Sequence, residues 1–327
     1  MRSIQFLIAC ALLVAGILAS SFAHGSVSVD SPAPRIGVVT MGPGEIFWER
    51  FGHDAIVVDD PRLGEPIAYN FGFFDMAEPG FITRFVLGRM EYMLVALPLA
   101  QDLSYYSKVG RGARVQWLAM DPAQARQLAL DLAENAKPEN ARYRYDYYTD
   151  NCATRVRDAL DRALGGSLKR HLDTRSSGDT YRSESVRLAS PDPWMWLGFD
   201  LALGPYADRP LSRWQQAYLP GALAEDLRDA TATDGKPLVT SEQELLPQLQ
   251  AAEPTSQRRR IIPWLLIGLA LGISIVAFAR RVPRTLAACA SLFWLLCGGI
   301  GLVLAFGWAF TDHVALWANR NLLLFNP

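Results

Sequence analysis

Two long apolar segments near the C-terminus constrain the fold of this chain more than any other feature of its 327 residues. The first runs from Ile261 to Ala279 and has arginines at both ends, and the second runs from Thr285 to Phe310. Each is long enough to cross a hydrocarbon core of about 30 Å, which a helix spans with about 20 apolar residues. Because only a few residues separate them, we predict a transmembrane hairpin over residues 258–310.

The N-terminus has the pattern of a secretory signal. Met1-Arg2 precedes an apolar run from Ile4 to Leu18, and Ser21-Phe22-Ala23 matches the small-x-small site at which such signals are cut. We therefore expect residues 1–23 to be a cleaved signal peptide. The two alternatives are an uncleaved anchor and lipidation of Cys10, which ends a lipobox-like stretch.

Export sets the orientation of the hairpin, which the arginines at both ends of the first span leave open. With a signal peptide, residues 24–257 form a periplasmic domain. The loop at 280–284 is then cytoplasmic and the tail at 311–327 is periplasmic. We therefore predict a bacterial inner-membrane protein whose main domain faces the periplasm.

Charge and motif content exclude several classes of function. The net charge is -1 and charged residues make up 20% of the chain, whereas phosphate binding needs a concentrated basic surface. We therefore expect no nucleic-acid partner. The sequence contains no metal-ligand spacing and no phosphate-binding loop, so we expect neither a metal nor a cofactor.

The exported domain has an α+β pattern. Alternating apolar segments bounded by Gly, Pro and Asp predict strands at 35–41, 53–58, 66–74, 92–97, 113–120 and 143–147. Asp121-Pro122 opens a helix that reaches about Asn135, and Asp150-Asn151 caps a second helix that reaches about Leu164. We expect one or two helical turns at 45–51, a polar loop at 167–190 and a polar linker helix at 241–252. Short strands combined with separate helices indicate an α+β fold.

Cysteine usage draws attention to Cys152. Cys10 lies in the predicted signal, and Cys289 and Cys297 lie in the second apolar span, so Cys152 is the one thiol of the exported domain. It directly follows Asp150-Asn151 and so falls in the first turn of a helix, where free amide groups and the helix dipole favour a thiolate. This setting suits a catalytic nucleophile, and the alternative is a buried, inert cysteine.

A thiol nucleophile needs a base, and His53 is the best candidate among the four histidines. It starts a predicted strand directly after Gly52, where the missing side chain permits close backbone approach. His24 would be the new N-terminus, His171 lies in a predicted polar loop, and His313 lies beyond the second span.

Asn70 is the best candidate for the group that orients the base. If the strands at 53–58 and 66–74 form a hairpin that turns near residues 62–63, His53 lies opposite Gly72 and Asn70 lies diagonally on the same face. Asn70 is then expected to hold one tautomer of the imidazole. The alternatives are Tyr69 and Asp75.

Four sequence blocks resemble the Lnb N-terminal periplasmic domain family. They are F-G-H-D-A-I-V-V (51–58), Y-N-F-G-F-F-D (69–75), Y-D-Y-Y-T-D-N-C-A-T-R-V-R-D (145–158) and A-L-G-P-Y-A-D-R-P-L (202–211). The resemblance covers most of residues 35–230. It implies a circularly permuted relative of NlpC-type and papain-like cysteine enzymes, in which the histidine strand precedes the cysteine helix. The tail at 311–327 is also similar to tails that follow such membrane hairpins.

The resemblance also implies an activity. The better-understood members of the family are bacterial lipoprotein N-acyltransferases, which take an acyl chain from a phospholipid and pass it to the N-terminal amine of a lipoprotein. Cys152 matches the motif cysteine and His53 the motif histidine, so Cys152 is expected to carry the acyl chain as a thioester. The alternatives are a cysteine peptidase or amidase that acts on cell-wall peptides through the same two residues, and a non-catalytic envelope module.

Two further groups of residues have two interpretations each. Trp194, Trp196 and Trp214 either seat the domain on the membrane interface or pack in its core. Asp312 and His313 either approach the site or a lipid head group, or end the second membrane helix in water.

Overall fold

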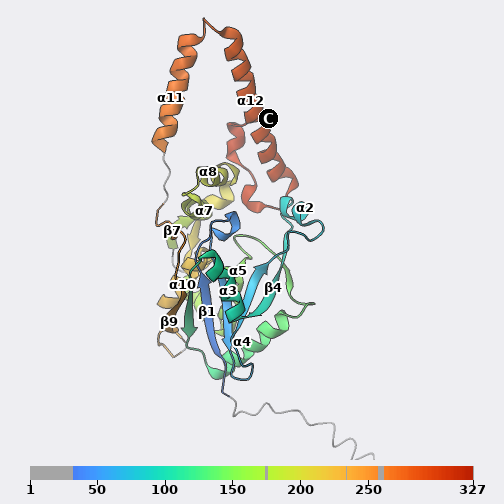
Figure 1. Ribbon diagram of the computed structural model, residues 1–327, viewed down its shortest axis with the longest axis vertical. Coiled ribbons are helices and arrows are strands. Elements are labelled where there is room, and N and C mark those ends of the chain that lie inside the picture. Colours follow the sequence, from blue (N-terminus) through green and yellow to red (C-terminus); the bar gives the residue numbers. More distant parts are fainter. Residues whose placement is uncertain (1–31, 174–175, 233, 257–260, 327) are drawn as a thin grey trace, which may run out of the picture. The chain divides into compact units, whose positions relative to one another are not determined.

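A seven-stranded antiparallel sheet forms the centre of the periplasmic domain (Figure 1). The computed structural model describes residues 32–173, 176–232, 234–256 and 261–326, so the predicted signal peptide lies outside the described residues. The order across the sheet is β6-β4-β3-β2-β1-β5-β9. The strands are β1 (Arg35–Met41), β2 (His53–Asp59), β3 (Ile67–Phe73), β4 (Glu91–Pro98), β5 (Ala113–Leu118), β6 (Arg142–Arg144) and β9 (Val239–Leu246).

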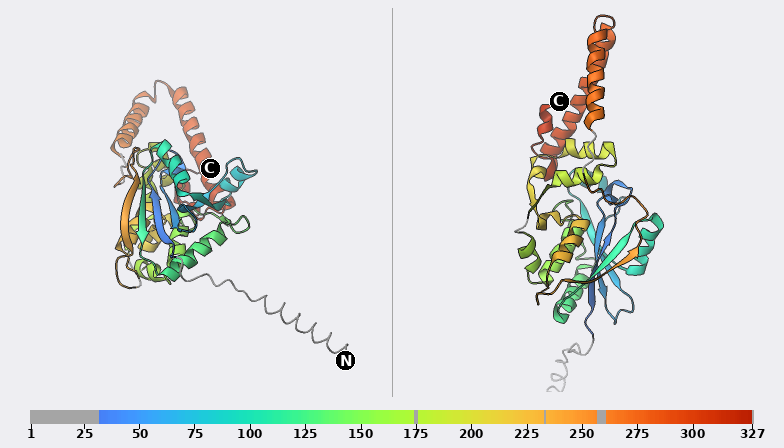
Figure 2. Two further views of the ribbon diagram at one scale, coloured as in Figure 1. Left: turned by 60° about the horizontal axis from the view of Figure 1, so that its bottom comes forward. Right: turned by 90° about the vertical axis from the view of Figure 1, so that its left-hand side faces the viewer.

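Helices cover both faces of this sheet (Figure 2). Alternate residues of a strand point to opposite faces, and in β1 Ile36 and Val38 pack in the core shared with α4 (Pro122–Asn135), α5 (Cys152–Ala163) and α10 (Pro220–Asp229). Val39 and Met41 pack in a second core with Tyr106 of α3 (Leu99–Val109). The sheet therefore separates α5 from α3.

The remaining elements lie outside the seven-stranded sheet. The helices are α2 (Phe81–Val86), α6 (Ser167–Leu172), α7 (Tyr181–Ala189), α8 (Pro193–Ala202) and α9 (Arg213–Gln216). The short 3-10 turns are η2 (Phe47–Glu49), η3 (Pro205–Asp208), η4 (Val314–Leu316) and η5 (Arg320–Leu323). β7 (Ser176–Thr180) and β8 (Pro210–Ser212) pair in a small separate ladder.

Two apolar helices, α11 (Ile261–Phe278) and α12 (Pro283–Phe310), are long enough to cross a membrane. After Phe310 the chain turns back along α12, and η4 and η5 both contact that helix. A methyl group added at Gly307 would lie 3.2 Å from the Leu316 side chain. The tail therefore packs against the last turns of α12.

The sequence predicted this architecture in outline. The α+β domain and the two-helix hairpin after it are confirmed, and all six predicted strands are present. The strand expected at 143–147 is shorter and covers Arg142–Arg144, because Asp146 starts a turn that its carboxylate closes with the amides of Tyr148 and Thr149.

Two predictions about local structure are wrong. Residues 167–190 are not a polar loop, since they contain α6, β7 and α7. α7 buries the charges that make this stretch look solvated, as Glu184 is 4% exposed and pairs with Arg187. Residues 241–252 are not a linker helix, because most of β9 lies there and pairs with β5 at the sheet edge. An edge strand with one face in water can carry the polar alternation that β9 shows.

Candidate active site

The N-terminus of α5 is held by Asn151, and Cys152 is the first residue of the helix. Asn151 Oδ1 accepts a hydrogen bond from the Thr154 amide at 2.9 Å, and the Asn151 amide donates to Thr154 Oγ1 at 2.7 Å. The Asn151 side chain also donates to the carbonyls of Tyr147 and Tyr218. The cap therefore joins three segments, and it fixes the position of the half-buried Cys152.

The Cys152 thiol is neutral, which corrects the expectation that the helix start favours a thiolate. Burial raises its pKa to about 12, and the carboxyl group of Asp54 raises it as well. Hydrogen bonds from the backbone amides of Asp54, Ala153 and Cys152 lower the pKa, but burial outweighs them. A base would therefore have to take the proton of this thiol before the sulfur could act as a nucleophile.

His53 and Asn70 are in contact, as the predicted hairpin requires. β2 pairs Ala55 with Asn70, a register that places His53 opposite Gly72. The distance from His53 Nε2 to Asn70 Oδ1 is 2.9 Å. Tyr69 packs in the core with α5 and Asp75 caps a turn at Ala77, so the two rival partners lie elsewhere.

The hydrogen bonds of Asn70 define the tautomer of His53. Asn70 Nδ2 donates to Asp102 Oδ2 at 2.9 Å, so its Oδ1 is the acceptor and His53 Nε2 carries the proton. This leaves the lone pair on Nδ1. Burial lowers the pKa of His53, while Asn70, Asp102 and Asp54 raise it. The imidazole is therefore neutral near pH 7 and able to accept a proton.

Asp102 is part of this site and was missed in the sequence. It is 9% exposed and lies in α3 on the same stripe as Leu99, Leu103 and Tyr106, which pack on the sheet. A carboxylate at i, i+3 and i+4 spacing among apolar residues is costly to bury without a partner. That spacing was the available signal.

A bulge in β3 brings the cysteine helix close to the histidine strand. The ladder shifts between Asn70 and Phe73, and Gly72 adopts a φ of 94° that favours glycine. A methyl group added at Gly72 would lie 3.7 Å from Cys152 Cβ. The backbone of Asp54, the residue after His53, is among the groups that lower the pKa of Cys152. No hydrogen bond joins the thiol to the imidazole in the described parts of the chain.

Asp54 is a second residue that the sequence did not reveal. Its side chain is fully buried, and Thr40 Oγ1 donates to its Oδ1 at 2.7 Å. Burial raises its pKa to about 7. A protonatable carboxyl group therefore lies beside both His53 and Cys152.

Aromatic side chains border the thiol on the β6 side. Burial raises the pKa of Tyr143 and Tyr145, and the nearby Cys152 adds to both shifts. The Tyr143 hydroxyl would lie 3.9 Å from a methyl group at Gly72. It is buried and has no hydrogen-bond partner among the described residues. It is therefore a free donor next to Cys152.

The tail after α12 binds the domain, so Asp312 and His313 do not simply end the helix in water. Asp312 pairs with Arg89 and Arg144, at 3.0 and 2.9 Å. His313 Nδ1 lies 2.6 Å from the Tyr147 hydroxyl. Arg144 and Tyr147 lie on the segment that leads into the cysteine helix, whereas Arg89 lies between α2 and β4.

Of the three tryptophans, only Trp194 fits an interfacial role. Trp194 is 67% exposed, whereas Trp196 is buried. Trp214 packs against the core of α5, with the Arg157 guanidinium 3.9 Å from its ring centroid. Trp196 and Trp214 therefore stabilise the fold.

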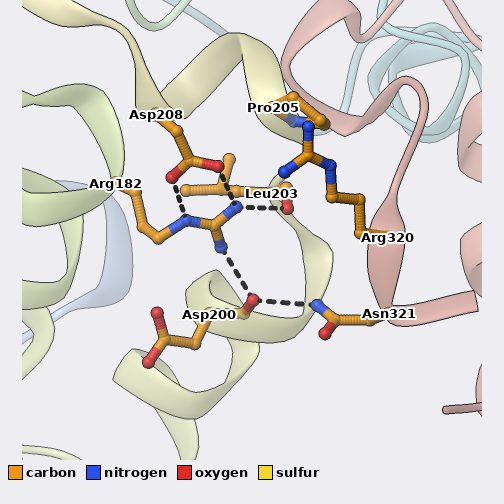
Figure 3. Close-up of a pocket in the computed structure, with 7 residues that line it drawn as sticks. All are labelled: Arg182, Asp200, Leu203, Pro205, Asp208, Arg320 and Asn321. Atoms are coloured by element: carbon orange, nitrogen blue, oxygen red, sulfur yellow. Dashed lines mark hydrogen bonds and ion pairs between the residues drawn. The ribbon is translucent and has the colours of Figure 1, made fainter. Parts of the chain in front are cut away.

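A cavity of about 240 Å³ lies where the tail meets α7, α8 and η3, away from Cys152 (Figure 3). Arg182 lines it and bonds to Asp208 and to the carbonyls of Asp200 and Leu203. Asn321 of the tail donates to the Asp200 carbonyl at 3.1 Å. The cavity is thus part of the tail-binding surface. His171 lines a different depression, beside α6.

Two family models match the chain. The model described as the Lnb N-terminal periplasmic domain matches residues 18–186, which include His53, Asn70, Asp102 and Cys152. The model described as the Lnb transmembrane domain matches residues 258–327, which contain α11, α12 and the tail. No curated protein and no solved structure shows a significant match.

Proposed function

The chain belongs to the Lnb family, and from this membership and the geometry at Cys152 we propose that it is a cysteine acyltransferase. It is an inner-membrane protein with a periplasmic domain. In the proposed reaction a fatty-acyl chain moves from a phospholipid to the N-terminal amine of a lipoprotein. Cys152 carries the chain between the two as a thioester.

The first step uses the neutral thiol and the neutral imidazole. His53 Nδ1 takes the proton of Cys152 as the sulfur attacks the ester carbonyl, so that a C–S bond forms. The C–O bond then breaks, and the imidazolium returns the proton to the departing lysophospholipid oxygen. Asn70 and Asp102 hold the ring, and the Asp102 charge stabilises the imidazolium that forms.

The tetrahedral intermediate carries a negative oxygen that needs donors. The Tyr143 hydroxyl has no other partner in the described chain, and the Cys152 amide lies at the open start of α5. Donors already in place as the charge develops lower the barrier, and loss of one such donor commonly costs 10²–10³-fold in rate. We assign the oxyanion site to these two groups.

The second step transfers the acyl chain. The lipoprotein amine attacks the thioester, so a C–N bond forms and the C–S bond breaks. His53 takes a proton from the amine and returns it to the sulfur, which restores the neutral thiol. No external oxidant, reductant or metal is needed for this balance.

The observation that carries the proposal is the hydrogen-bonded series His53–Asn70–Asp102, whose strands also approach the capped start of the cysteine helix at Gly72. A purely structural cysteine needs no buried imidazole held in one tautomer. The membrane hairpin favours acyl transfer over peptide cleavage, because the acyl donor lies in the bilayer.

Intact mass of the protein purified from membranes tests the proposal. We expect a fatty-acyl adduct that hydroxylamine removes, that is absent in Cys152→Ala and that persists in the matched variant Cys289→Ala. An adduct that survives in Cys152→Ala, or full function of that variant in cells, would reject acyl transfer through this thiol. Cleavage of cell-wall peptides by the parent protein, with no adduct, would instead identify a peptidase or amidase.

A further inference from the structure

Exposed apolar side chains gather on three elements that take no part in the proposed chemistry. They lie on α2, on η2 and on α8, and we call this set the apolar ridge. Its members are Phe47, Trp48, Ile82, Phe85, Val86, Trp194 and Leu197. Large apolar side chains that cluster on a surface usually mark a contact with a partner or a membrane.

Aromatic contacts make the ridge continuous. The Trp48 ring meets Phe74 edge-on at 6.0 Å, and Phe74 stacks on Phe81 of α2 at 5.6 Å. On the other side Phe47 stacks on Trp194 of α8 at 6.2 Å. η2 therefore bridges α2 and α8.

Both ends of the ridge are tied to the segment that leaves the second membrane helix. The Asp312 amide donates to the Leu87 carbonyl at 2.8 Å, at the end of α2. His313 Nε2 lies 2.9 Å from the Phe85 carbonyl. At the other end, Asn319 Nδ2 donates to the carbonyls of Leu201 and Ala202, each at 2.7 Å.

The length of α12 indicates the depth of these contacts relative to the bilayer. Its 28 residues rise about 42 Å at 1.5 Å per residue, and a bilayer with its head groups is about 40–45 Å thick. Phe310, the last residue of α12, is still 69% exposed. Thr311 therefore lies at the level of the head groups, and so do the ridge elements bonded to the residues after it.

We propose that the apolar ridge inserts into the periplasmic leaflet of the bilayer that holds α11 and α12. The occupant of this surface is lipid, and Trp194 and Trp48 lie where tryptophan is enriched in membrane proteins. Phe74, which joins η2 to α2 in the ridge, lies two residues after Gly72, where an added methyl group would lie 3.7 Å from Cys152 Cβ. Insertion would bring lipid esters close to the thiol, and this consequence rests on the proposed function. The insertion itself does not rest on it.

Spin labels at two matched positions test insertion. Ile82 in α2 and Leu130 in α4 are each 63% exposed, and α4 follows β5 at the end of the sheet opposite His53. Each is changed to cysteine in the full chain with Cys10, Cys152, Cys289 and Cys297 replaced by alanine. The protein is placed in nanodiscs of phosphatidylethanolamine and phosphatidylglycerol. Oxygen, which partitions into the bilayer, and a nickel chelate, which stays in water, are used as relaxation agents.

We expect the ratio of oxygen to nickel accessibility to be at least about fivefold higher at Ile82→Cys than at Leu130→Cys, since oxygen is concentrated where apolar chains exclude water. Trp48→Cys, on a different element, should behave like Ile82→Cys and replaces it if that variant does not fold. Equal ratios at ridge and control positions would overturn the proposal. The spin-label measurement does not depend on turnover. If the labelled positions insert but the parent protein carries no acyl adduct, acyl transfer is rejected and the ridge assignment stands.

Discussion

At the residue scale, the hydrogen bonds around Asn70 decide which nitrogen of His53 can act as a base. Asn70 donates to Asp102 and accepts from His53, so the two ends of its amide cannot exchange roles without losing both bonds. The sequence indicated the His53–Asn70 pair through hairpin register. Asp102 was missed although its spacing on the apolar stripe was a signal, because its helix was not predicted and it lies 32 residues from Asn70 in the chain.

The Asp102 carboxylate raises the pKa of His53, so Asp102→Asn should lower that pKa further. The rate of Cys152 acylation is lost at low pH when His53 becomes protonated, and this acid limb should therefore move to lower pH in the variant. Above pH 7 we expect the rate to fall by at least about tenfold, because asparagine can still accept from Asn70 but carries no charge to stabilise the imidazolium that forms. Intact-mass kinetics between pH 4.5 and 8 measure this, with Asp131→Asn on exposed α4 as control. A shift to higher pH would contradict the assigned network.

Asp54 makes stability depend on pH. Its pKa is raised from 3.8 to about 7 in the folded state, so the folded protein binds this proton more tightly than the unfolded chain. The stabilisation is complete below about pH 4 and is lost as the pH rises through 7. Asp54→Asn, which keeps an acceptor for Thr40, should raise the melting temperature at pH 8 and leave it nearly unchanged at pH 4. The same gain at both pH values would show that Asp54 does not titrate in this range.

At the element scale, the residue that caps α5 also forms hydrogen bonds to two other segments of the chain. Among the described residues, Asp121 caps α4 with bonds to its own helix alone, whereas Asn151 caps α5 and also donates to Tyr147 and Tyr218. Loss of a cap costs about 1 kcal/mol, and each further hydrogen bond adds about 1 kcal/mol. The two caps can therefore be compared by matched alanine variants.

Asp121→Ala should lower the free energy of unfolding by about 1 kcal/mol, and Asn151→Ala by about 2–3 kcal/mol. Denaturant titration followed by circular dichroism measures both. Only Asn151→Ala should also slow acylation of Cys152, because only that cap positions the thiol. Equal losses in the two variants would mean that the bonds to Tyr147 and Tyr218 contribute nothing to stability.

The elements that the sequence predicted are those with strong local signals. β1, β2 and β3 alternate or are bounded by turn residues, and α4 and α5 carry caps at their first turns. α2, α3 and β9 were missed or misassigned because their patterns depend on partners distant in the chain. β9, for example, needs β5 to pair with, and its Glu242 binds Arg228 and Arg114.

At the scale of the whole molecule, the tail joins the membrane helices to the periplasmic domain. Gly204 is pressed against it, because a methyl group there would lie 2.0 Å from the Trp317 carbonyl oxygen. Nothing lies within 4 Å of the same position at Gly198 in α8. Alanine variants of the two glycines can therefore distinguish loss of tail docking from a general effect of replacing glycine by alanine.

Gly204→Ala should release the tail, and Gly198→Ala should not. Release would expose the bond after Arg320, which follows the docking residue Asn319, and trypsin should cut there at least about tenfold faster in Gly204→Ala. The protein in nanodiscs and a time course by mass spectrometry suffice for the measurement. Identical cleavage rates in the parent and both variants would refute docking through Gly204.

The raised pKa of Cys152 also has a consequence for survival of the thiol in an oxidising compartment. Oxidants and disulfides react with the thiolate. At pH 7 a pKa of about 12 leaves roughly one thiol in 10⁵ ionised. A cysteine exposed to periplasmic oxidants with a low pKa would be consumed between turnovers. In the proposed reaction, burial at the start of α5 would therefore keep the Cys152 thiol reduced until His53 removes its proton in the presence of substrate.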